Sequence, residues 1–135
     1  MMSDPWKNPS NATSALVGFR ISNDATWNDA IQFGPLADGT EWSFPAGKTF
    51  LMDVKRNRYD VSPLLQLSTA NGRIVSLSDT LRLIQFNVAI ADILANLPPG
   101  DYVYSFIMDD PITTPSQRTQ LMHGDVCVGQ GPTYP

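Results

Sequence analysis

The stretch KTFLMDVK at residues 48–55 decides the fold class of this chain. Its residues alternate with a period of two, so apolar side chains point to one face and polar side chains to the other. The apolar face carries Phe50, Met52 and Val54, and the polar face carries Thr49, Asp53 and Lys55. Because successive side chains of a β-strand point to opposite faces, the pattern predicts a strand with one buried face.

Similar short runs lie on both sides of this strand. We predict further strands at residues 15–21, 27–33, 41–44, 64–69, 73–77, 81–87, 101–108 and 119–128. The 135 residues include 11 prolines and 9 glycines, as expected for short strands joined by tight turns. Asn71-Gly72 separates two of these runs, and both residues tolerate positive φ, so we predict a hairpin between 64–69 and 73–77.

The last two predicted strands also alternate. Residues 101–108 place four large apolar side chains on one face, namely Tyr102, Tyr104, Phe106 and Met108. Residues 119–128 place Met122, Gly124, Val126 and Val128 on one face, and Leu121, His123, Asp125 and Cys127 on the other. In 81–87 the alternation sets Arg82 on the same face as Ile84 and Phe86. Each pattern predicts one face against a core.

One segment changes to a helical period. Between residues 88 and 97 the apolar residues Ile90, Ile93, Leu94 and Leu97 recur at spacings of three and four. This spacing predicts a short amphipathic helix, with Asn87 as its N-cap and Pro98-Pro99-Gly100 as its stop. We expect about seven or eight of these nine runs to be strands of the final sheets, which together with one helix predicts an all-β, immunoglobulin-like sandwich in a single domain. We divide the chain into an N-terminal arm (1–14), the sandwich (15–130) and a C-terminal tail (131–135).

Charge and composition indicate which partners to expect. Nine Lys and Arg against 13 Asp and Glu give a net charge of −4, and charged residues make up only 16% of the chain. The basic residues are scattered, whereas a nucleic-acid-binding domain usually has a basic face. No apolar stretch approaches the roughly 20 residues that cross a membrane, and residues 1–7 lack the apolar run of a secretion signal. We therefore expect a soluble protein made in a cytoplasm, without a nucleic-acid or membrane partner.

Candidate catalytic and metal-binding residues are few. Asp109-Asp110 with Asp101 lacks the regular spacing of a calcium loop, so we interpret the pair as a solvated acidic turn. His123 and Cys127 are the single histidine and cysteine. In a strand they lie on the order of 13 Å apart, too far for a catalytic contact. We expect no enzymatic activity, no cofactor and no metal site.

The three tryptophans and one proline are the candidate partner-binding positions. Pro5 and Trp6 stand in the polar arm, where a tryptophan is an anchor for its own domain or for a neighbour. Trp27 and Trp42 flank a turn-rich region and are the better surface candidates in the body. We therefore name Pro5, Trp6, Trp27 and Trp42 as candidate partner-binding residues, with core packing as the alternative for Trp27 and Trp42.

The segment LQLSTANGRI at 65–74 resembles the "L-x-L-T-T-x-N-G-x-I" hairpin of small tailed-phage proteins encoded among tail, baseplate and fibre genes. ADILANLPPGDYVY at 91–104 then resembles their short helix, "LPPG" stop and following strand. Asp109-Asp110-Pro111 matches their acidic turn, and GDVCV at 124–128 matches a "G-x-V-x-V" strand. The resemblance covers about residues 45–130.

This group resembles immunoglobulin-like sandwiches such as the N-terminal domain of upper baseplate proteins. The resemblance implies a virion structural protein of the tail, baseplate or tail fibre, acting as an adaptor in multiple symmetric copies and bound to other virion proteins. No catalytic residues carry over. Residues 1–20 and 23–45 depart from the group, which leaves the position in the particle open. Two alternatives remain: a capsid decoration or head-fibre protein, and a carbohydrate-binding module.

Overall fold

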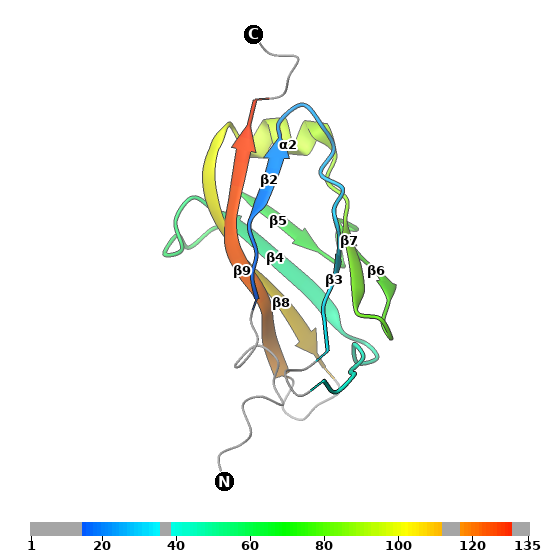
Figure 1. Cartoon of the computed structure of the whole chain (residues 1–135). Helices are drawn as coiled ribbons and strands as arrows, with labels where there is room; N and C mark the ends of the chain where they lie inside the picture. Colours follow the sequence, from blue (N-terminus) through cyan, green and yellow to red (C-terminus); the bar gives the residue numbers. More distant parts are fainter. Residues whose placement is uncertain (1–14, 36–38, 112–116, 131–135) are drawn as a thin grey trace.

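The computed structural model describes residues 15–35, 39–111 and 117–130. Two β-sheets face each other with a short helix at one end (Figure 1). The larger sheet contains β1 (Ala15–Leu16), β2 (Phe19–Ser22), β4 (Thr49–Lys55), β5 (Leu65–Ser68), β8 (Gly100–Asp110) and β9 (Gln117–Gly129). The smaller sheet contains β3 (Ala30–Gln32), β6 (Ile74–Ser78) and β7 (Leu83–Phe86), and the helix is α2 (Ile90–Asn96). No helix of the described chain is long and apolar enough to span a membrane.

The strand order is that of an immunoglobulin-like sandwich. The larger sheet runs β1-β9-β8-β4-β5, with β2 also on β9, and the smaller sheet runs β3-β7-β6. These correspond to the GFCC′ and BED sheets of that fold. The Tyr102 hydroxyl at the start of β8 donates to the carbonyl of Pro98, which is the tyrosine corner found in such domains. The predicted all-β sandwich with one helix before its penultimate strand is confirmed.

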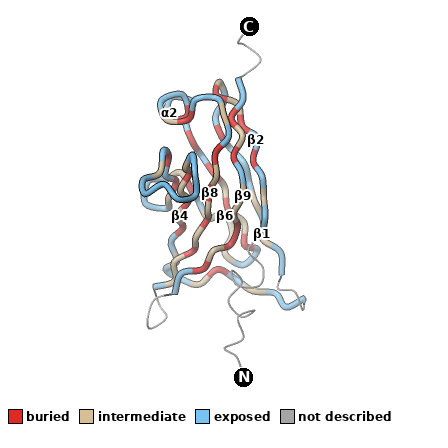
Figure 2. Tube along the Cα trace, turned by 90° about the vertical axis from the view of Figure 1, so that its left-hand side faces the viewer, coloured by how far each residue is buried: buried red, intermediate tan, exposed pale blue. Residues whose placement is uncertain are grey.

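The core lies between the sheets and follows the alternation of the strands. Figure 2 shows buried positions spaced along the strands and separated by less buried ones. The buried faces predicted for β4 and β8 are confirmed. Aromatic rings contact one another across this core. Neighbouring ring centroids lie 5.0–6.0 Å apart in the series of contacts Trp27, Phe86, Phe106, Phe50 and Phe44. Ring contacts at these distances add to the hydrophobic effect of burial.

The Asn71-Gly72 hairpin prediction is wrong. Strand β5 pairs with β4 and β6 pairs with β7, so the connection at 69–73 crosses from one sheet to the other. Gly72 does adopt a positive φ of 78°, and the Asn71 side chain accepts from the Ser68 amide at 3.0 Å. A turn therefore lies at the predicted position, but of these two residues only Gly72 has a positive φ. The pairing differs because the apolar faces of the two strands contact a shared core from opposite sheets.

The helix is shorter than predicted, and its N-cap is Ala89 rather than Asn87. Asn87 still belongs to the sheet, since its amide donates to the carbonyl of Arg73 at 2.9 Å. The strand predicted at 41–44 is also wrong: this segment is irregular and is held by side chains described below. In both places a tertiary hydrogen bond outweighs the local pattern.

Two strands depart from simple alternation. The run at 15–21 is divided into β1 and β2, which both lie parallel to β9 in one continuous register. In β9 a register shift opposite Phe106 and Ile107 places Leu121 and Met122 side by side in the core. The prediction that Leu121 lies on the same face as His123 is therefore wrong, because a β-bulge adds one residue to that strand.

Candidate interaction surface

Trp27 lies in the core, so its prediction as an exposed partner-binding residue is wrong. Only 2% of it is exposed, and its ring centroid lies 5.5 Å from that of Phe19. Its indole Nε1 donates to Asp29 Oδ2 at 2.8 Å, which satisfies the polar atom at the edge of the core. Its backbone forms a bridge with Val88, and this long-range contact fixes the ring inside.

Trp42 is half-buried at the rim of the sandwich. Its Nε1 donates to the carbonyl of Gly34 at 2.9 Å, and its ring packs edge-on against Phe44 with centroids 5.5 Å apart. It also lines an apolar cavity of about 190 Å³ between β1 and β3, together with Phe33 and Leu121. Pro5 and Trp6 lie outside the described residues.

Arg82 holds this rim together and is not among the candidate residues predicted from the sequence. Only 4% of it is exposed, and it has a positive φ of 57°. Its Nε donates to the carbonyl of Phe33 at 2.8 Å, and its Nη1 donates to the carbonyls of Trp42 at 2.5 Å and Thr80 at 3.2 Å. Nη1 also lies 2.9 Å from Glu41 Oε2. A signal was present, because the alternation of 81–87 sets Arg82 on the same face as Ile84 and Phe86, and the structure buries that face.

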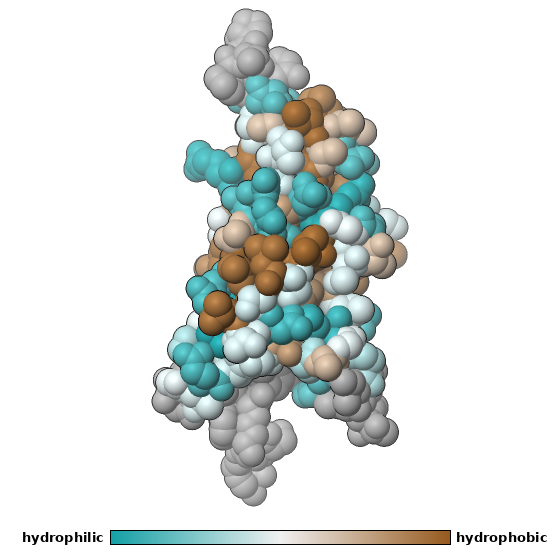
Figure 3. Space-filling model, turned by 90° about the vertical axis from the view of Figure 1, so that its right-hand side faces the viewer, coloured by the Kyte–Doolittle hydropathy of each residue, from teal (hydrophilic) through white to brown (hydrophobic). Residues whose placement is uncertain are grey.

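The smaller sheet exposes an apolar surface. Val75, Leu77 and Leu81 are exposed around β6 and the turn that follows it. The view onto this side of the molecule shows apolar surface gathered near the middle of the face, with polar surface above and below it (Figure 3). Apolar groups that gather on one face favour protein contacts, whereas scattered apolar residues are normal. We call Val75, Leu77 and Leu81 the β6 patch.

Asp79 fixes the end of β6 beside this patch. Its carboxylate accepts hydrogen bonds from Lys48 Nζ and from Ser76 Oγ, each at 2.5 Å. Its backbone carbonyl accepts from the amide of Phe44 at 3.0 Å. The hydrogen bonds from Lys48 and then Ser76 lower the pKa of the Asp79 carboxyl below its ordinary value. The end of β6 is thus tied to the segment that precedes β4.

We expect Asp79→Asn to lower the free energy of unfolding at neutral pH by less than about 1 kcal/mol, because the side chain is partly exposed. Because the folded-state pKa is lowered, the ionised Asp79 carboxylate stabilises the fold at pH values above the unfolded pKa of about 3.9. This stabilisation is lost as the pH falls through the folded-state pKa. Urea titrations at several pH values should therefore show the two proteins converging below about pH 4. Lys48→Met should reproduce the neutral-pH loss, and a constant difference across the pH range would contradict this account.

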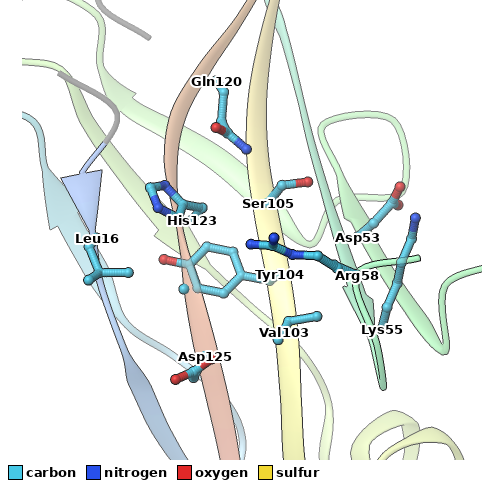
Figure 4. A pocket seen from close by; sticks show the side chains of 11 residues that line it. Leu16, Asp53, Lys55, Arg58, Val103, Tyr104, Ser105, Gln120, His123 and Asp125 are labelled. Atoms are coloured by element: carbon cyan, nitrogen blue, oxygen red, sulfur yellow. The ribbon is translucent and has the colours of Figure 1, made fainter. Parts of the chain in front are cut away.

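The outer face of the larger sheet carries a polar hollow of about 530 Å³. Lys55 and Arg58 lie along it with Asp53 and Asp125, so charges of both signs line it. Figure 4 shows Arg58 extending across β8, with His123 and Asp125 on the neighbouring strand β9. This mixture favours polar contact with a protein over selective binding of one ionic ligand.

Tyr104 forms part of the wall of this hollow. Its hydroxyl donates to the carbonyl of Val17 at 2.8 Å, which ties β8 to the segment between β1 and β2. Burial, and to a lesser degree the charge of Asp125, raises the pKa of the Tyr104 hydroxyl. The hydroxyl therefore stays protonated and serves as a structural donor.

The acidic residues considered for a cation site do not meet. Asp109 and Asp110 are the last residues of β8 rather than a turn, whereas Asp101 lies at its other end. Asp109 lies 3.6 Å from Arg118 on the neighbouring strand. Among the residues with described positions, no group of three His, Cys, Asp or Glu is placed to hold a metal ion. His123 and Cys127 both lie in β9, so the prediction that one strand contains both residues is confirmed.

Comparison of the sequence with models of known protein families gives no match, and comparison with curated proteins gives none either.

Proposed function

We propose that this chain is a non-enzymatic structural protein of a tailed-phage particle, an adaptor or attachment element of the tail, baseplate or fibre region. The observation that carries the proposal is the β6 patch, an exposed apolar surface on the smaller sheet of the sandwich. The resemblance of residues 45–130 to small phage tail proteins supplies the biological setting. The function is to present surfaces and strand edges to neighbouring virion proteins, in repeated symmetric copies.

The fold suits a static connecting role. Arg82 ties the carbonyls of Phe33 and Trp42 together, so both ends of the connection around residues 36–38 are held against the sandwich. The low content of charged residues limits the cost of removing the surface from water on assembly. Trp27, one of the two tryptophans that a carbohydrate-binding alternative would need at the surface, is buried in the core. We therefore do not propose sugar binding.

The N-terminal arm is the second part of the proposal. Strand β1 begins at Ala15 and is an edge strand of the larger sheet, and residues 1–14 precede it in the sequence. We assign to Pro5 and Trp6 the role of contacting a neighbouring virion protein. A tryptophan supplies a large apolar area, and an extended segment can add to the edge of another sheet.

Deletion of residues 1–14 should reduce the copies of this chain in purified particles at least about tenfold, the ratio that a loss of about 1.4 kcal/mol of binding free energy produces. The measurement is quantitative mass spectrometry of particles made with the truncated chain, alongside cryo-electron microscopy of particles with the full chain. The truncated protein should keep its thermal transition, which serves as the control for folding. Density at the tail or its fibres would support the adaptor role, density on the shell would indicate a decoration protein, and absence of the full chain would overturn the proposal.

A further inference from the structure

Strand β6 is the outer strand of the smaller sheet, and one of its edges pairs with no strand of the described chain. The amide of Asn87 donates to the carbonyl of Arg73, which makes these two residues a hydrogen-bonded pair of the antiparallel ladder. Such pairs alternate along a ladder. Val75 therefore directs its backbone groups to β7, whereas Ile74 and Ser76 direct theirs to the open edge.

The larger sheet protects its own outer strand, β5. The carbonyl of Gln66 accepts from Asn71 Nδ2 at 3.0 Å and from Arg73 Nη1 at 2.8 Å. The amide of Ser68 donates to Asn71 Oδ1 at 3.0 Å. Side chains thus occupy the backbone groups that a neighbouring strand would use. The outer strand β5 is thus protected by side chains, whereas the edge of β6 is bare in the described part of the chain.

The side chains of β6 also favour pairing. Residues 74–78 contain no charge and no proline, which are the usual protections of an exposed edge. A register shift between Ser76 and Ser78 marks a bulge, which confines regular pairing to the first part of the strand. Arg73 precedes the strand and Asp79 follows it, and each is ion-paired within the chain, Arg73 with Asp92 at 3.1 Å and Asp79 with Lys48 at 2.5 Å. Neither end therefore presents an unpaired charge to a neighbouring strand.

We propose that β6 pairs with β6 of a second copy of this chain, antiparallel about a two-fold axis at Val75. In this register Ile74 of each copy lies opposite Ser76 of the other, so the two-fold axis produces two identical hydrogen-bonded pairs. The outward backbone groups of both residues are then paired. The two Val75 side chains meet on the outer face. The antiparallel direction is the one that a two-fold axis perpendicular to the sheet generates, and it makes the two halves of the contact identical.

Self-pairing is a property of the isolated chain, so its test does not depend on the virion. We expect the full-length protein to show a mass in sedimentation equilibrium that rises toward the dimer with concentration. Val75→Lys should raise the dimer dissociation constant at least about tenfold, because it places two like charges at the axis. The matched control is Leu94→Lys on α2, since Leu94 is 48% exposed and Val75 is 42% exposed. A monomeric wild-type chain, or equal effects of the two variants, would overturn the proposal.

Disulfide trapping tests the register. In a Cys127→Ser background, Val75→Cys should form a covalent dimer under mild oxidation, because opposite Cβ atoms of antiparallel strands lie about 4.5–5.5 Å apart. Leu94→Cys in the same background is the control and should remain uncrosslinked under the same conditions. Crosslinking of both variants at the same rate would indicate random collision and contradict the two-fold pairing.

Discussion

Replacing Arg82 by alanine is expected to lower the free energy of unfolding by about 3 kcal/mol, which corresponds to a fall in Tm on the order of 10 °C for a domain of this size. The guanidinium satisfies the carbonyls of Phe33, Trp42 and Thr80, and alanine leaves all three without this donor. Each acceptor that is left buried and unpaired costs about 1 kcal/mol or more. The packing of Arg82 on the Trp42 ring, 5.8 Å from its centroid, is lost as well.

Two further variants separate the causes. Glu41→Gln should cost well under about 1 kcal/mol, because the Glu41 side chain is 75% exposed and its charge is screened by water. Arg82→Lys should recover only part of the stability, since an ammonium group cannot reproduce the planar arrangement of donors. Thermal unfolding followed by circular dichroism gives the comparison. A loss in Glu41→Gln as large as that in Arg82→Ala would show that the ion pair, rather than the carbonyl network, holds this rim.

Gly124→Ala is expected to cost about 3 kcal/mol, or to detach the N-terminal strand from β9. A Cβ at this position would lie 2.2 Å from the carbonyl oxygen of Val17 and 2.9 Å from its carbonyl carbon. Both are backbone atoms, so no side chain can move aside. Gly124 also has a φ of 154°, which side chains rarely adopt. The same Val17 carbonyl accepts from Tyr104, so a displaced strand would leave that buried hydroxyl without its partner.

The effect should be strongest on the first strand. The amide of Val17 donates to the carbonyl of His123 at 2.9 Å, so its hydrogen-exchange rate reports directly on the attachment of this segment. We expect faster exchange at Val17 in Gly124→Ala than in the wild type. Gly129→Ala is the matched control in the same strand, because an added Cβ there meets no atom within 4 Å. Wild-type exchange and stability in Gly124→Ala would refute the close approach described for these strands.

The local sequence does not distinguish which candidate residues are exposed and which are buried. Trp42 was selected and lies at the rim, but Trp27 was selected for the same reason and is buried. Nothing in the residues around Trp27 specifies its bridge to Val88, which lies 61 positions further along the chain. The β6 patch was not selected at all, because apolar residues at 73–77 look the same whether a strand is central or at an edge.

The sequence by itself determined the fold class, most strand positions and the helix near residue 90. Alternation over 49–55 and 101–108 is a local property, since neighbouring side chains must point to opposite faces of any strand. The change of period near residue 90 and the stop at Pro98-Pro99 are also local, because they depend only on residues close together in the sequence. These features required no knowledge of which strands pair.

Only the tertiary structure decided how the strands are distributed between the sheets. The Asn71-Gly72 turn is compatible with a hairpin, but burial of both flanking strands against one core sends them to different sheets. The same long-range packing buries Arg82 among backbone carbonyls and leaves β6 at an open edge. Pairing and burial depend on contacts between residues distant in sequence, and their free energies exceed the local preferences of a turn or a single side chain.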